Sequence, residues 1–114
     1  MKFLRLMLVV VAIGFSSNSN ADVAIKGSAS CGEWIQYRSP TSGTEGGWRT
    51  LVSQSWLMGY LSGLAVGRNK NFMQNTDAQS IYLWMDNFCN SNPLDNLDTG
   101  GYVLADELQK RMKR

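Results

Sequence analysis

The chain has 114 residues, 44% of them hydrophobic and 18% charged, with a formal net charge of +2 at neutral pH. This length suits one domain. Four Trp, four Tyr and four Phe residues disfavour intrinsic disorder, because they leave too much apolar surface for a solvated coil. The chain contains no histidine. This excludes a Ser-His-Asp triad, a Cys-His pair and any histidine-bearing metal site built within it.

The first segment has the features of an export signal. Lys2 and Arg5 form a short basic region, ten mostly apolar residues (LMLVVVAIGF) follow, and Ser19-x-Ala21 has the small residues that signal peptidase reads. The apolar run is too short for a membrane span, which needs about 20 residues. We therefore predict a signal peptide over residues 1–21 and a secreted product that no longer contacts the membrane after cleavage.

The positive charge of the chain lies near its two ends. Without residues 1–21 the chain keeps 9 basic and 9 acidic residues, and four of those cations lie within residues 110–114. Residues 22–109 therefore carry a net charge of −4. Binding of nucleic acid needs a basic face on the body of the domain, so we expect no nucleic-acid partner. The terminal cations complement the dipole of a helix C-terminus.

Cys31 and Cys89 are the only two cysteines. An exported protein folds in an oxidising compartment, so we expect a disulfide between them. Closing a loop of this length removes about 4 kcal/mol of conformational freedom from the unfolded chain. That is a large part of the stability of a small domain.

The first elements after the signal are short. Residues 22–27 are expected to form a short strand or an extended arm. Ser30 and Glu33 have the spacing of a capping box, which predicts a short helix from Cys31 to about Arg38. A loop rich in Gly, Ser and Thr, expected to be flexible, follows over residues 39–47.

The strongest helical signal spans about Trp48 to Arg68. Its expected core face comprises apolar residues at helical spacing, namely Trp48, Leu51, Val52, Trp56, Tyr60 and Leu64. Gly59, Gly63 and Gly67 recur every four residues on one face. Each glycine inside a helix costs about 1 kcal/mol relative to alanine. We expect either another helix packed closely over this stripe or a shallow groove for a partner.

Two more helices follow a polar connection over residues 68–75. Thr76 to Gln79 has the pattern of a second capping box, and the next helix is expected to bury Ile81, Trp84, Met85 and Phe88. Asn92-Pro93 predicts the start of the last helix, with Asn92 as its N-cap. The expected core face of that helix comprises Leu94, Leu97, Gly101, Leu104, Ala105, Leu108 and Met112.

These elements predict an all-α fold: a small bundle of a short helix plus three longer helices, stapled by one disulfide. They form a single helical domain over residues 22–114.

The chain offers few groups for catalysis. Paired carboxylates remain, as in glycoside hydrolysis, and the candidates are Glu33, Glu45, Asp86, Asp95 and Asp98. The predicted helix starts already account for Glu33 and Asp95, and Asp95 and Asp98 have the spacing of a solvated helix face. Neither an S-x-x-K nor an EF-hand pattern is present. We predict that the protein is not an enzyme and needs no metal or cofactor.

The aromatic residues suggest contact with another protein. Tyr82 and Tyr102 fall outside the apolar stripes and are expected to be exposed, and exposed aromatic side chains suit protein–protein contact. With the glycine-rich helix, they give a set of partner-binding candidates: Gly59, Tyr60, Gly63, Tyr82 and Tyr102.

The order of these landmarks resembles the HdeA/HdeB group of small periplasmic proteins. The landmarks are an export signal, Cys31 followed by Trp34, then Trp56-x-x-Gly59-Tyr60-x-x-Gly63, and Trp84-x-Asp86-x-x-Cys89-x-x-Asn92-Pro93-Leu94 before a last helix. The resemblance implies a helical periplasmic protein with one disulfide. The best-known members are acid-stress chaperones, folded dimers at neutral pH that become client-binding monomers in acid. A similar layout occurs in periplasmic immunity proteins that neutralise toxins delivered by type VI secretion.

Two functions therefore remain open. The first is an acid-activated chaperone for unfolded proteins, with Asp77, Asp86, Asp95 and Asp98 as acid-sensing candidates because Asp side chains titrate near pH 4. The second is a protein with one dedicated partner, such as a toxin. The expected partners are protein clients or that single protein, and a homodimer is an open alternative.

Overall fold

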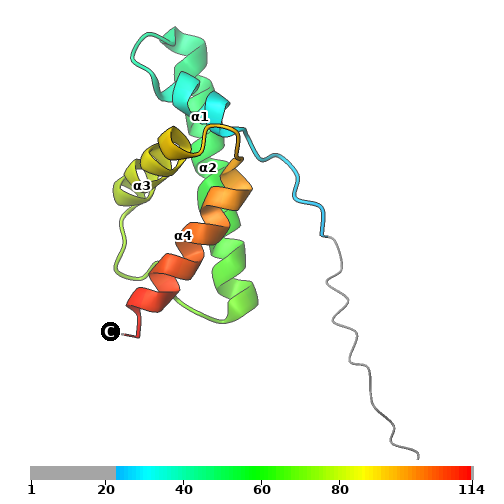
Figure 1. The fold of residues 1–114 in the computed structure, drawn as a ribbon, viewed down its shortest axis with the longest axis vertical. Coiled ribbons are helices and arrows are strands. Elements are labelled where there is room, and N and C mark those ends of the chain that lie inside the picture. The colour runs from blue at the N-terminus through cyan, green and yellow to red at the C-terminus, as the bar shows by residue number, and fades with distance from the viewer. Residues whose placement is uncertain (1–22, 114) are drawn as a thin grey trace, which may run out of the picture.

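The computed structural model describes residues 23–113, which contain four α-helices (Figure 1). The helices are α1 (Cys31–Arg38), α2 (Gly43–Arg68), α3 (Ala78–Ser91) and α4 (Leu97–Arg111). The predicted all-α fold of one short and three longer helices is confirmed. The predicted signal peptide lies outside the described residues.

Helix α2 is the longest element, and α1 and α4 both pack against it (Figure 1). Helix α3 packs against α1 and α4. The centre of the bundle is formed by fully buried side chains from all four helices: Cys31, Trp34, Leu57, Leu61, Ile81, Met85, Cys89 and Leu97. Burial of this apolar surface supplies the main stabilisation of the fold.

The predicted disulfide is present. Cys31 and Cys89 are both fully buried, and their Cα atoms lie 4.8 Å apart. The bond joins the first residue of α1 to α3 across a sequence separation of 58 residues. The predicted capping box is also confirmed, because Ser30 Oγ accepts from the Glu33 N–H at 3.0 Å and Glu33 Oε2 accepts from the Ser30 N–H at 2.9 Å.

The expected strand or arm before α1 is an exposed extended segment over residues 23–27. Within the described part of the chain the only β-type pairing is an isolated bridge between Ser30 and Asn96. Gly27 has a positive φ of 78°, and a Cβ there would lie 2.9 Å from Trp56 Nε1. The arm therefore requires glycine at the point where it passes Trp56.

The predicted loop over residues 39–47 is wrong in its second half, because α2 begins at Gly43. Ser42 Oγ donates to the Tyr37 carbonyl at 2.9 Å and so ties the start of α2 to the end of α1. Gly46 packs on this turn, since a Cβ at Gly46 would collide with the Ser42 side chain. The glycines that predicted a loop instead allow a tight helix–helix corner.

The predicted core face of α2 is wrong in its N-terminal part, where Trp48, Leu51 and Val52 are 66%, 58% and 52% exposed. The other predicted residues, Trp56, Tyr60 and Leu64, are half-buried. Leu57 and Leu61, which the prediction left out, are the fully buried residues of this helix. Residues four apart rotate about 40° around a helix at each step. The stripe that starts at Trp48 therefore begins on the solvent side and reaches the core only near the middle of the helix.

No helix packs over the glycines of α2. Apart from chain neighbours and the nearby backbone of α2 itself, no atom of the described chain lies within 4 Å of a Cβ placed at Gly59, Gly63 or Gly67. The close helix approach lies in α4 instead. A Cβ at Gly100 would lie 2.7 Å from Met85 Sδ, and one at Gly101 would lie 2.8 Å from the Tyr60 ring.

Helix α3 starts one residue later than the capping pattern predicted. Asp77, and not Thr76, is the N-cap, because its carboxylate accepts from the Ser80 N–H at 2.7 Å. The predicted core residues Ile81 and Met85 are buried, while Trp84 and Phe88 are half-buried. Tyr82 was expected to be exposed but is buried.

The predicted start of the last helix at Asn92-Pro93 is wrong. Asn92 caps the end of α3, and α4 begins at Leu97. Its first N–H groups bond to the segment before α1, from Leu97 N–H to the Ala29 carbonyl at 2.9 Å and from Asp98 N–H to Ser28 Oγ at 3.0 Å. These acceptors are about 70 residues away in sequence, so local pattern could not predict this cap.

Two residues of the expected α4 core face are exposed. Leu94 lies in the turn before α4 and is 98% exposed, and Met112 follows the helix and is 49% exposed. The rest of the predicted face is buried: Leu97, Gly101, Leu104, Ala105 and Leu108.

Candidate functional site

The described residues contain no cluster of three or more metal-ligating side chains. No helix among them is long and apolar enough to cross a membrane. Three features of the described structure are candidates for a functional site. They are a set of carboxylates between the helices, an exposed face of α2, and a cleft between α3 and α4.

Asp86 connects α3 to α1. Its Oδ2 accepts from Arg38 Nη2 at 2.7 Å, and its Oδ1 accepts from Trp34 Nε1 at 2.8 Å and also from Arg38 Nε. The Arg38 guanidinium lies 5.2 Å from the centre of the Trp34 ring and 6.0 Å from that of Tyr82. Both charged side chains are about a quarter exposed. The cluster is thus a partly desolvated ion pair with hydrogen-bond and cation–π support.

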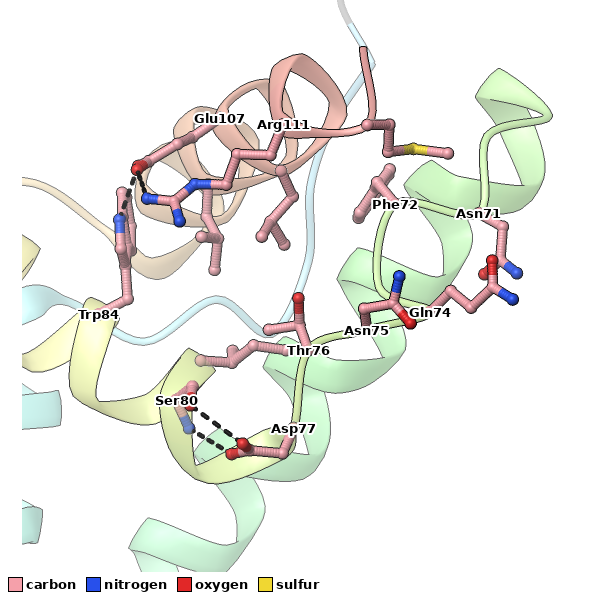
Figure 2. Close-up of a pocket in the computed structure, with 14 residues that line it drawn as sticks. Asn71, Phe72, Gln74, Asn75, Thr76, Asp77, Ser80, Trp84, Glu107 and Arg111 are labelled. Atoms are coloured by element: carbon pink, nitrogen blue, oxygen red, sulfur yellow. Dashed lines mark hydrogen bonds and ion pairs between the residues drawn. The ribbon is translucent and has the colours of Figure 1, made fainter. Parts of the chain in front are cut away.

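Glu107 connects α4 to α3. Its Oε2 accepts from Trp84 Nε1 at 2.8 Å and its Oε1 accepts from Arg111 Nη2 at 2.8 Å (Figure 2). The hydrogen bond from Arg111, together with that from Trp84, holds the pKa of Glu107 below its usual value. The preceding residue, Asp106, pairs with Arg68 of α2 at 2.8 Å.

The four acid-sensing candidates have different roles. Asp86 and Asp98 each join distant segments, the latter by accepting from Ser28 Oγ at 2.7 Å. Asp77 caps its own helix, and hydrogen bonds from Ser80 lower its pKa. Asp95 contributes its backbone carbonyl, which accepts from the Cys31 N–H at 2.8 Å.

Sequence reasoning missed Asp106 and Glu107. The only local signal was the i, i+4 spacing of Glu107 and Arg111. The partners of the two carboxylates on α2 and α3 are brought near only by the fold.

An exposed stripe without charged residues runs along α2. We define the outer face of α2 as Trp48, Leu51, Val52, Ser55, Gly59, Ser62, Gly63 and Val66, all of them exposed. Val66 is 82% exposed. The large apolar side chains of this face lie near the two ends of the helix, with Ser and Gly residues between them.

The partner-binding candidates do not form one site. Gly59 and Gly63 lie on the outer face of α2. Tyr60 points toward α4, stacks on Trp56 with ring centres 5.0 Å apart, and has a pKa raised by burial and then by Asp98. Tyr82 is buried, whereas Tyr102 is 52% exposed beneath the Arg68 guanidinium.

A cleft of about 590 Å³ opens between the start of α3 and the end of α4 (Figure 2). Its floor consists of buried apolar side chains: Phe72, Ile81, Leu104 and Leu108. The segment before α3 forms one rim, and Trp84, Glu107 and Arg111 form the other. No sequence pattern predicted this cleft, because its walls come from two helices and a turn.

Comparison with protein-family models, with curated proteins and with solved structures found no match. The resemblance to the HdeA/HdeB group therefore remains a prediction from the landmarks of the sequence.

Proposed function

We propose that this chain is a small periplasmic protein-binding protein that loosens in acid and then holds unfolded client proteins. The observation that supports this proposal is the chemistry of the contacts between the helices. All but one of the described side-chain-to-side-chain hydrogen bonds between separate elements end on a carboxylate, the exception being Arg68 to Gln109. Such contacts weaken when the carboxylate is protonated.

The way in which the stability of the fold depends on pH follows from the pKa of Glu107. Its pKa in the folded protein lies below its usual value, so its contacts stabilise the fold at any pH above that usual value. This stabilisation is lost as the pH falls through the lowered value. Asp77, whose pKa is also lowered, acts in the same direction. Acid therefore releases the end of α4 from α3 and weakens the cap of α3.

The disulfide does not titrate and continues to join α1 to α3 in acid. Loss of the carboxylate contacts would separate the remaining helix pairs and expose their apolar sides, such as Leu57, Leu61 and Leu104. An opened but cross-linked chain of this kind offers apolar surface to unfolded clients without becoming a random coil.

The proposal is tested with residues 22–114, purified with the disulfide formed. A client that aggregates in acid is followed by light scattering at about pH 2–3 and at pH 7. We expect suppression of aggregation in acid only, and its loss when both cysteines are replaced by serine. Absence of suppression at a stoichiometric excess would refute the chaperone function.

A second candidate is the neutralisation of one dedicated protein, such as a secreted toxin. The observation that favours it is the outer face of α2, which is already exposed in the folded protein and needs no acid to appear. The double variant Val52→Lys/Val66→Lys should abolish binding of such a partner at pH 7. Val103→Lys is the matched control, because Val103 is 43% exposed on α4.

The periplasmic location rests on the export signal predicted in the sequence. Mass spectrometry of the protein from a periplasmic fraction should give a product that begins at Asp22. A product that retains residues 1–21 would contradict the location and, with it, both candidate functions.

A further inference from the structure

The cleft between α3 and α4 has a rim of primary amides. We call Asn71, Gln74 and Asn75 the amide rim; all three are exposed, and no side-chain hydrogen bond is formed by any of them within residues 23–113. Figure 2 shows them along one side of the cleft. A primary amide offers both donors and an acceptor, so this rim can pair with the N–H and C=O groups of a peptide backbone.

The floor beneath the amide rim is apolar and closed. Phe72, Ile81 and Leu104 are at most 3% exposed. Every buried side-chain N or O atom in the described part of the chain has a hydrogen-bond partner. Met112 is 49% exposed at the mouth. Methionine adapts its shape readily to an apolar ligand. Because the floor side chains are almost fully covered, Met112 and the half-buried Trp84 supply the apolar surface that one bulky apolar side chain can contact.

The rim opposite the amides has unused positive charge. Glu107 is already occupied by Trp84 and Arg111, and Arg111 engages it through Nη2 alone. The other guanidinium N–H groups of Arg111, whose side chain is 66% exposed, are free to bind a carboxylate. Lys110 and Lys113 are near Arg111 in the sequence, do not line the cleft, and form no ion pair in the described structure.

We propose that this cleft binds an extended peptide segment in which an acidic residue adjoins a bulky apolar residue. The amide rim holds the peptide backbone, the apolar side chain lies over the floor beside Met112, and the acidic side chain pairs with Arg111. Successive side chains of an extended chain point to opposite sides, so one faces the floor while its neighbour can reach the charged rim. This inference rests on the proposed protein-binding function and names the ligand of one site.

Fluorescence anisotropy at pH 7 tests the inference, with the full chain after residue 21 titrated to about 1 mM. The probe is the fluorescein-labelled peptide Gly-Ser-Asp-Phe-Ser-Gly. We expect saturable binding that weakens about tenfold when Phe in the probe is replaced by Ala, and about tenfold when Asp is replaced by Lys.

Two variants of the protein locate the binding. Gln74→Ala/Asn75→Ala removes two exposed amides, leaves the core unchanged, and should weaken binding about tenfold. Gln79→Ala is the matched control, because Gln79 is exposed in the first turn of α3 but does not line the cleft. Arg111→Gln should remove the preference for Asp over Lys in the probe.

Failure of this inference can be separated from failure of the proposed chaperone function. Absence of saturable binding, or equal binding by the double variant and Gln79→Ala, overturns the peptide site even if the protein suppresses aggregation in acid. Binding at pH 7 that follows the pattern above supports the site even if no suppression occurs in acid.

Discussion

The Arg38 guanidinium binds both carboxylate oxygens of Asp86, a residue 48 positions later in the sequence. This pair lies at the end of α1, and the Cys31–Cys89 disulfide lies at its start. Helix α1 has only 8 residues, and isolated helices of this length are unstable in water. Attachment to α3 at both ends explains how so short a helix can form part of the core.

Asp86→Asn should destabilise the fold by about 1–3 kcal/mol, because it leaves the Arg38 charge between two aromatic rings without its partner. The value lies below that for a fully buried pair since both side chains are about a quarter exposed. Urea unfolding at pH 7 measures the change. Glu45→Gln is the control: it breaks an exposed i, i+4 pair and should change stability by less than about 0.5 kcal/mol. Equal effects of the two substitutions would contradict a structural role for Asp86.

Replacing Cys31 and Cys89 by Ser should lower the free energy of unfolding by about 4 kcal/mol, because the bond closes a long loop in the unfolded chain. Thermal unfolding of the oxidised protein, the reduced protein and the double variant measures this. We expect the reduced protein and the variant to agree. A reduced protein as stable as the oxidised one would show that the core alone holds α1 in place.

Alanine at two glycines should act in opposite directions. Gly101→Ala places a Cβ 2.8 Å from the Tyr60 ring, so we expect a loss of about 1–3 kcal/mol. Gly63→Ala places a Cβ in open space and should stabilise the helix by about 0.5–1 kcal/mol. Urea midpoints of the two variants provide the comparison. Destabilisation by Gly63→Ala would mean that another chain covers the outer face of α2 in solution.

Glu107→Gln should reduce the acid sensitivity of the fold. The wild-type contacts of Glu107 stabilise the protein above the usual pKa of a glutamate and disappear as the pH falls through its lowered value. The variant should therefore be less stable than the wild type at pH 7, by no more than about 1 kcal/mol because Glu107 is partly exposed. The difference should vanish near pH 2–3. Urea midpoints at several pH values measure it, and a difference that does not depend on pH would refute the assignment.

The sequence by itself determined the helical class, the cap of α1 and the disulfide partners. The cap depends on groups three residues apart, and a chain with only two cysteines allows one intramolecular pairing. The helical periods of α3 and of α4 also identified most of their buried residues, such as Ile81, Met85 and Leu104.

Only the tertiary structure decided where α4 begins and which side of α2 faces water. The first N–H groups of α4 are capped by Ser28 and Ala29, which no local pattern includes. The side of α2 that is buried depends on where α1 and α4 pack along it. Thr50 donates to the Tyr37 carbonyl of α1, whereas Trp48, two residues earlier and therefore on the opposite side of the helix, is 66% exposed. The carboxylate contacts and the cleft likewise join residues from separate helices. The sequence contains the residue types of these contacts and of the cleft, but only the packing of the helices brings those residues together.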